Sequence, residues 1–254
     1  MEYVALPGVL ARGPEQYLPL YGVLPPKGRE FAYRGLTFDF EHEVTRIANY
    51  IECGDTSSDI VVIGSSFGGM LVPFVVEALS YRFDRERLKV VIVDGPAGLE
   101  TIMDANARFL ANKFVANLAV GVTSALRLKV PVGDDMLPKP DEISADLDTQ
   151  AVVETARTSL KGHGMGMLLS QTALMIRVVK DGSLARACAS LADVDTTYLA
   201  CVHAGNGVIR QPLAADWWTM HLSGLKVEVV AATHCGYLQN QPEFMGALRK
   251  ILAI

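Results

Sequence analysis

The stretch Val61-Val62-Ile63-Gly64-Ser65-Ser66-Phe67-Gly68-Gly69 joins a β-branched run to an apolar helical pattern. A continuous run of this kind is typical of a strand buried on both faces. Residues 69–79 are apolar nearly all round, as in a helix packed against a sheet centre. The turn between them fits the pattern G-x-S-x-G, which holds the serine in a strained conformation with its hydroxyl above the sheet edge. The small residues two before and two after the serine let strand and helix approach closely. We therefore predict that Ser66 is a nucleophile.

Short apolar runs alternate with helical patterns along most of the chain, which predicts an α/β fold with a mainly parallel sheet of about six strands and flanking helices. The expected strands are Tyr3–Leu6, Glu30–Tyr33, Asp59–Ile63, Lys89–Val93, Thr197–Val202 and Lys226–Ala231. Residues 44–51 place apolar side chains at i, i+3, i+4 and i+7, which predicts a helix with Asp39 at its N-cap. A final helix is expected over Pro242–Ile251.

The region 99–180 differs from the rest because it holds no convincing strand. Helical patterns occur near Ala105–Leu118, Asp146–Leu160 and Met165–Val179. About eighty helical residues between two strands of a parallel sheet indicate an inserted cap. We therefore expect a core in two parts, 1–98 and 181–254, with a helical cap at 99–180 between them.

Charge and composition exclude some classes of function. The 254 residues carry a net charge of −5, which gives no reason to expect nucleic acid as a partner. The N-terminus lacks the features of a signal peptide, and no apolar run approaches the roughly 20 residues needed to span a membrane. We expect a cytoplasmic protein and leave open that it forms a homodimer. The cysteines have no metal-site spacing and are expected to be small buried residues in a reducing compartment: Cys53, Cys188, Cys201 and Cys235.

A serine nucleophile needs a histidine base, and His234 has the most suitable position. It follows the last expected strand, on a loop at the carboxyl edge of the sheet beside the Ser66 turn. The other four histidines fit less well. They lie on a solvated helix face, in the cap, at a strand end and after a Trp-Trp pair: His42, His163, His203 and His221.

With these residues in place, the chain resembles the α/β-hydrolase superfamily, in particular its compact capped members, which include esterases, thioesterases, lactonases and hydroxynitrile lyases. The resemblance covers nearly the whole chain and implies the order nucleophile, acid, histidine. It also implies an oxyanion hole made of two backbone N–H groups, one from Phe67. The other would come from the loop Leu6–Leu10, with Val9 as donor and Leu10 second. A small-molecule substrate is implied, with no metal or organic cofactor.

Two departures from the family pattern matter. The chain begins almost at the oxyanion loop, so the family's initial antiparallel hairpin is missing and we expect an all-parallel sheet. The acid is ambiguous as well, because Asn206 stands where the family usually has Asp. An amide there can cost about 10⁴ in rate. Asp94, at the end of the strand after Ser66, is our working assignment, and Asn206 as a weak orienting group stays open.

The expected activity is hydrolysis of an ester, thioester or lactone of a mainly hydrophobic small molecule through an acyl-enzyme on Ser66. Two alternatives remain: a non-hydrolytic enzyme of the same fold, such as a lyase or cyclase, and a catalytically weakened ligand-binding relative. Apolar cap residues could line a substrate pocket, although packing of the cap helices on the core explains most of them better: Phe109, Leu110, Phe114, Leu118, Met165, Met167, Leu168, Leu169 and Met175.

Overall fold

The computed structural model describes residues 1–8, 20, 22–33, 38–54, 57–97, 171, 174–175, 177–179, 181–201, 212–232 and 242–253. The chain divides into two compact units, one made of 1–33, 41–97 and 183–254 and the other of 34–40 and 98–182. Most of the second unit lies outside the described residues. The predicted cap at 99–180 therefore stays a prediction.

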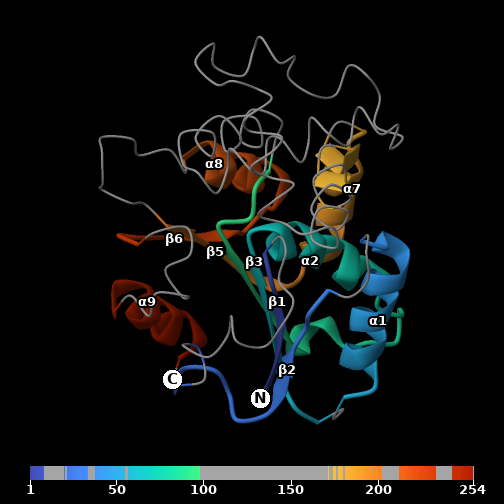
Figure 1. The fold of residues 1–254 in the computed structure, drawn as a ribbon, viewed down its shortest axis with the longest axis horizontal. Coiled ribbons are helices and arrows are strands. Elements are labelled where there is room, and N and C mark those ends of the chain that lie inside the picture. The colour runs from blue at the N-terminus through green and yellow to red at the C-terminus, as the bar shows by residue number, and fades with distance from the viewer. Residues whose placement is uncertain are drawn as a thin grey trace, which may run out of the picture. The chain divides into compact units, whose positions relative to one another are not determined.

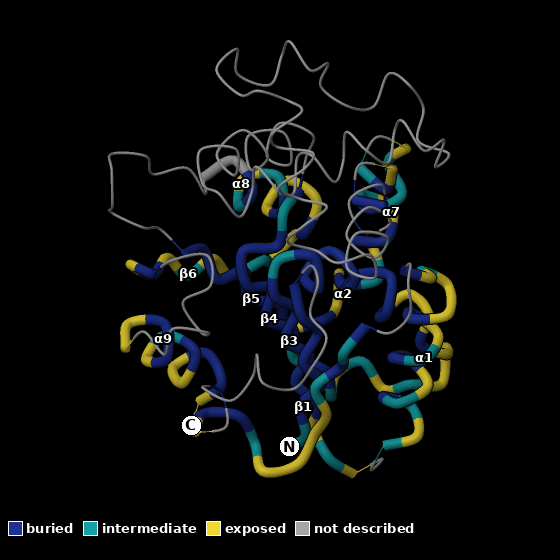
Figure 2. The backbone as a smooth tube through the Cα atoms, in the orientation of Figure 1, coloured by how far each residue is buried: buried dark blue, intermediate teal, exposed yellow. Residues whose placement is uncertain are grey.

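The described residues form one six-stranded sheet in the order β2-β1-β3-β4-β5-β6, and all five strand pairs are parallel. The strands are β1 (Glu2–Leu6), β2 (Gly28–Glu30), β3 (Ile60–Ser65), β4 (Leu88–Val93), β5 (Asp195–Cys201) and β6 (Lys226–Val230). The prediction of a mainly parallel sheet of about six strands is confirmed. The centre of the sheet is buried, and exposed positions gather at its margins (Figure 2).

The position of β2 was predicted wrongly, since the strand covers Gly28–Glu30 rather than Glu30–Tyr33. The alternating aromatic residues that suggested a strand are buried after its end: Phe31 and Tyr33. Phe31 still donates its N–H to the carbonyl oxygen of Ala5, and Tyr33 is held through its hydroxyl. Backbone pairing with β1 therefore ends before the buried aromatic segment does.

Helices flank both faces of the sheet (Figure 1). The described helices are α1 (Phe40–Glu52), α2 (Phe67–Ala78), α7 (Ser183–Ala187), α8 (Pro212–His221) and α9 (Pro242–Leu252), with short 3₁₀ turns η2 (Arg85–Arg87) and η3 (Cys188–Leu191). Three helices, α1, α2 and α7, lie on one side, and α9 lies on the other. The predicted stripe at 44–51 is the buried side of α1, which begins directly after Asp39. The C-terminal helix was also predicted correctly.

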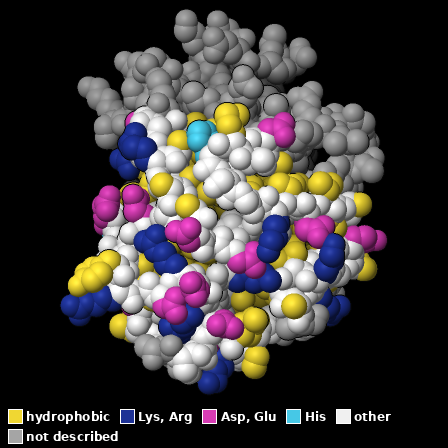
Figure 3. Space-filling model, turned by 180° about the vertical axis from the view of Figure 1, so that it is seen from behind, with side chains coloured by type: hydrophobic (Ala, Val, Ile, Leu, Met, Phe, Trp, Pro, Cys, Tyr) yellow, Lys and Arg dark blue, Asp and Glu magenta, His cyan; other side chains and the backbone are white. Residues whose placement is uncertain are grey.

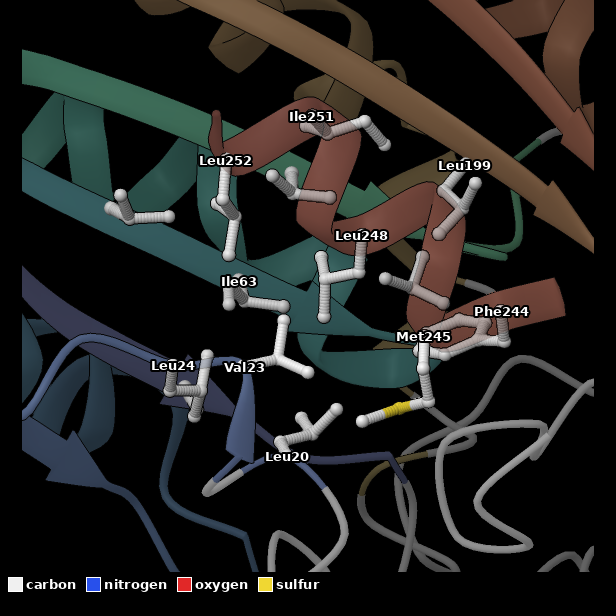
Figure 4. Packing of buried hydrophobic residues seen from close by; sticks show 14 of the residues in the cluster. Leu20, Val23, Leu24, Ile63, Leu199, Phe244, Met245, Leu248, Ile251 and Leu252 are labelled. Carbon is white, nitrogen blue, oxygen red and sulfur yellow. The ribbon is translucent and has the colours of Figure 1, made fainter. Parts of the chain in front are cut away.

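The side of the sheet that faces α9 contains a continuous apolar core (Figure 4). Side chains of α9 pack there against alternate residues of the strands and against the segment around Leu20–Leu24. The labelled contributors from α9 are Phe244, Met245, Leu248, Ile251 and Leu252. Their i, i+3 and i+4 spacing places them on one helix face, so α9 closes this side of the sheet.

Cys53 is exposed, so the expectation that it is buried was wrong: it follows the last residue of α1 and lies off the packed face of that helix. On the face shown in Figure 3, basic side chains of the described residues are interspersed with acidic ones. Among the described helices, none has the length and apolar character that crossing a membrane requires.

Candidate active site

Ser66 occupies the sharp turn between β3 and α2. Its backbone adopts φ 50° and ψ −119°, a strained conformation for a residue with a side chain. Ser66 is the N-cap residue of α2, yet its side chain makes no capping hydrogen bond to the helix. The positive end of the α2 dipole therefore lies beside this hydroxyl, where it favours developing negative charge.

Two glycines make this turn possible because neighbouring backbone fills the space of a side chain. A Cβ on Gly64 would lie 2.6 Å from the carbonyl oxygen of Gly68. A Cβ on Gly68 would lie 2.2 Å from the carbonyl oxygen of Leu6. Both separations are far below van der Waals contact, so β1, β3 and α2 meet only when both positions are glycine.

The loop that follows β1 approaches the Ser66 side chain at Gly8. A Cβ on Gly8 would lie 3.4 Å from the Cβ of Ser66 and 3.9 Å from its Oγ. Tyr33 holds the loop in place, since its hydroxyl donates a 2.9 Å hydrogen bond to the carbonyl oxygen of Pro7. The Tyr33 ring also meets Phe67 edge to face, with 5.7 Å between ring centroids. The start of the predicted oxyanion loop is thus fixed beside the predicted nucleophile.

Asp94 directly follows β4, the strand next to β3. It is 2 % exposed, and its φ of 47° is again in the left-handed region. Its backbone N–H donates to the carbonyl oxygen of Leu199 at 3.0 Å, and its Oδ1 accepts the N–H of Cys201 at 2.8 Å. The carboxylate therefore ties the end of β4 to the end of β5.

Aromatic side chains hold the next residue, Gly95, in place. Its carbonyl oxygen accepts a 2.8 Å hydrogen bond from Nε1 of Trp218 and a longer one, 3.4 Å, from the hydroxyl of Tyr198. Burial raises the pKa of Tyr198 well above its ordinary value, and the negative charge of Asp94 raises it further. The phenol therefore stays protonated and able to donate. A Cβ on Gly95 would lie 3.4 Å from the Cα of Gly69, so the turn held by these aromatic residues rests against the first turn of α2.

The whole chain aligns with solved structures of low sequence identity. MenH from Staphylococcus aureus matches with a TM-score of 0.59 and 14% identity, over 100% of this chain and 93% of that one. A hydrolase from Pseudomonas aeruginosa matches with a TM-score of 0.54 and 14% identity, over 100% and 90% of the two chains. An esterase from Exiguobacterium antarcticum matches with a TM-score of 0.53 and 12% identity, over 100% and 92%. The chain has the α/β-hydrolase fold. No family model matches it, and no curated protein matches its sequence.

The described residues contain the turn at Ser66, which we call the elbow, and the ends of β4 and β5, the two strands that follow it. Ser66, Phe67 and Asp94 lie together at this carboxyl edge of the sheet, since Ser65 pairs with Val93 across β3 and β4. Val9, Leu10, Asn206 and His234 lie outside the described residues, and their roles stay predictions. Of the other histidines, His42 is exposed on α1, and His221 is exposed at the end of α8.

Sequence reasoning missed the aromatic residues that surround the elbow. Tyr33 was assigned only to a strand, and Trp218 was used only to locate His221. Both carry a polar tip on a buried ring, and such tips usually find a hydrogen-bond partner. This polar tip on an apolar ring is the signal that could have pointed to Tyr33 and Trp218, but it does not identify Pro7 or Gly95 as their partners.

Proposed function

We propose that this protein is a serine hydrolase that cleaves an ester, thioester or lactone of a mainly hydrophobic small molecule. The observation that carries the proposal is the backbone of Ser66. A serine at φ 50°, between a buried strand and a buried helix, with its side chain not used as a helix cap, costs folding energy that an ordinary turn would avoid. Nucleophilic catalysis would account for this strain, because the strained turn places the serine hydroxyl above the sheet edge.

In the proposed reaction, the Oγ of Ser66 attacks the carbonyl carbon while His234 takes the hydroxyl proton. The N–H groups of Phe67 and Val9 stabilise the resulting oxyanion, each by about 3–4 kcal/mol when tested by removal. His234 then protonates the leaving alcohol, thiol or lactone oxygen as the acyl-enzyme forms. Water, deprotonated by His234, attacks the acyl-enzyme and regenerates the Ser66 hydroxyl.

Asp94 is the proposed acid that orients His234. Its position supports this role, since it follows the strand next to the elbow, and the backbone of Ser66 is hydrogen-bonded to the residue before it. Its Oδ1 accepts the N–H of Cys201, which fixes the orientation of the carboxylate. A fixed carboxylate is what a histidine base requires. Asn206 remains the alternative orienting residue.

Ester turnover tests this proposal. Purified protein is assayed with p-nitrophenyl esters of increasing acyl length, an acyl thioester and an acyl lactone. We expect turnover that increases with acyl hydrophobicity and is abolished by Ser66→Ala. Ser65→Ala is the matched control, because Ser65 is the buried neighbour at the end of β3 and is expected to leave turnover intact. Turnover that survives Ser66→Ala would contradict the proposal.

A non-hydrolytic enzyme of the same fold is the second candidate. It is favoured by the amide at residue 206, where the family usually has Asp. Under this reading, Ser66 and His234 act as an acid/base pair in a lyase or cyclase reaction, and ester turnover is negligible while a specific ligand still binds. A binding protein without catalysis would instead keep its biological activity in both Ser66→Ala and His234→Ala.

A further inference from the structure

The strand β6 forms one margin of the sheet within the described part of the chain. It pairs with β5 on one side, and no described strand pairs with it on the other. A strand margin offers a row of backbone N–H and C=O groups to another strand. Natural edges are usually kept short or given exposed charges, and β6 carries exposed valines as well as charged residues.

Alternate residues of β6 expose apolar side chains. Val230 is buried in the core beneath α9, and Glu228 points to the same side, where it pairs with Lys250 of α9 at 2.5 Å. Val227 and Val229 point to the opposite side and are 41% and 65% exposed. An edge strand with water on one face ordinarily carries polar residues there. The exposure of these two valines departs from that pattern.

The two exposed valines lie on the side of the sheet that carries α8. Val227 lies beside Tyr198 in the β5–β6 register, and the Tyr198 ring lies against Trp218 of α8. The face that carries the valines is thus the face on which α8 packs. We call Val227 and Val229 the β6 patch. The described residues include five exposed large hydrophobic side chains, and two of them form this patch.

The order of charges along β6 is self-complementary in one register only. When two copies of a strand pair antiparallel about a two-fold axis, side chains that face each other must lie on the same face of the sheet. One residue therefore faces its own copy, and the axis lies midway between the two. We call this an axis through that residue. An axis through Lys226 places two lysines opposite each other, and an axis through Glu228 places two glutamates opposite each other. Like charges directly opposite are destabilising.

An axis through Val227 removes both conflicts. Lys226 of each copy then lies opposite Glu228 of the other, which gives two ion pairs on one face. On the other face, Val227 lies opposite Val227, and Val229 lies opposite Leu225. Opposite charges and β-branched pairs are both favourable cross-strand neighbours. The strand therefore matches a second copy of itself in both charge and hydropathy.

We propose that β6 is the interface of a homodimer, in which two copies pair antiparallel about an axis through Val227 and continue the sheet from one copy into the next. A stable interface needs roughly 800 Å² from each partner, more than a five-residue strand supplies. Surface beside the strand must therefore contribute as well. This interface is independent of the reaction at Ser66.

A charge reversal tests the register. Mass is measured by sedimentation equilibrium over a wide range of protein concentrations, with thermal unfolding as the check on folding. We expect a dimer for the unchanged protein and at least about a tenfold larger dissociation constant for Glu228→Lys, which places lysine opposite Lys226. The double change Lys226→Glu with Glu228→Lys restores opposite charges and should restore the dimer.

A second pair of variants tests the patch while leaving Lys226 and Glu228 in place. Val229→Asp should give monomers, because Val229 is exposed in the single chain and would become buried when two copies pair. Tyr81→Asp is the matched control, since Tyr81 is 87% exposed on the turn after α2 and should leave the dimer intact. A protein that is monomeric at every concentration would overturn the proposal. So would a dimer that neither Glu228→Lys nor Val229→Asp weakens.

Discussion

The backbone N–H of Ser66 donates a 2.8 Å hydrogen bond to the carbonyl oxygen of Val93, the last residue of β4. The turn at Ser66 is therefore attached to the strand end that carries Asp94 and Gly95. Both residues are held by β5 or by α8 through hydrogen bonds of their own. The conformation of Ser66 thus depends on contacts made by residues far from it in the sequence.

Replacing Trp218 with phenylalanine tests this dependence. Trp218→Phe keeps a buried ring but removes the indole N–H that binds the carbonyl oxygen of Gly95, so we expect a stability loss of about 1–2 kcal/mol. The reaction of Ser66 with a fluorophosphonate should also slow, in its maximal rate rather than in its half-saturating concentration. Trp217→Phe is the control, since the Trp217 ring lies beside the ring of exposed His221, with 4.2 Å between centroids and a tilt of 46°. Equal reactivity in the two variants would show that Trp218 only packs.

Replacing Asp94 with asparagine tests the identity of the acid. Asp94→Asn keeps an oxygen that can accept the N–H of Cys201, so the strand ends should stay joined and stability should change little. The rate of ester hydrolysis should fall by about 10⁴, because an amide stabilises imidazolium poorly. Hydrolysis is measured beside Asn206→Asp. A full rate in Asp94→Asn together with a raised rate in Asn206→Asp would assign the acid to residue 206.

Adding one methyl group at Gly68 tests the close contact beneath the elbow. The new Cβ in Gly68→Ala would lie 2.2 Å from a backbone oxygen that cannot swing away. We expect the free energy of unfolding in urea to fall by about 3 kcal/mol or more. Gly246→Ala is the opposite case: it adds a methyl group on the exposed side of α9 with nothing within 4 Å. That variant should be more stable by about 0.5–1 kcal/mol. Similar changes in both variants would contradict the packing described for the elbow.

A methyl group at Gly8 separates reactivity from stability. Its nearest neighbours would be the Cβ of Ser66 at 3.4 Å and the Oγ at 3.9 Å, which are ordinary contacts. Gly8→Ala should therefore fold with nearly unchanged stability. The methyl group nevertheless occupies space beside the attacking oxygen, and we expect ester hydrolysis to fall at least about tenfold, since small displacements of reacting groups are costly. A full rate would place the substrate on another side of Ser66.

The sheet and the elbow were predictable from the sequence because both depend on local patterns. Continuous β-branched runs such as 60–63 and 90–93 are buried on both faces, and the glycines at 64 and 68 leave the room that the turn at Ser66 needs. The bounds of β2 were not predictable, because pairing with β1 rather than its own composition sets them. The hydrogen bond from Trp218 to the carbonyl oxygen of Gly95 was not predictable either. The two residues are 123 positions apart in sequence, and no side-chain pattern identifies a backbone carbonyl as an acceptor.

The most direct test of the central claim is covalent labelling of Ser66. The intact protein is treated with a fluorophosphonate, digested and analysed by mass spectrometry. We predict one phosphonylated peptide containing residues 64–68, modified on Ser66, and no labelling in Ser66→Ala, while Ser65→Ala labels as the unchanged protein does. A folded protein that is never labelled, or is labelled at another serine, would contradict the assignment of Ser66 as the nucleophile.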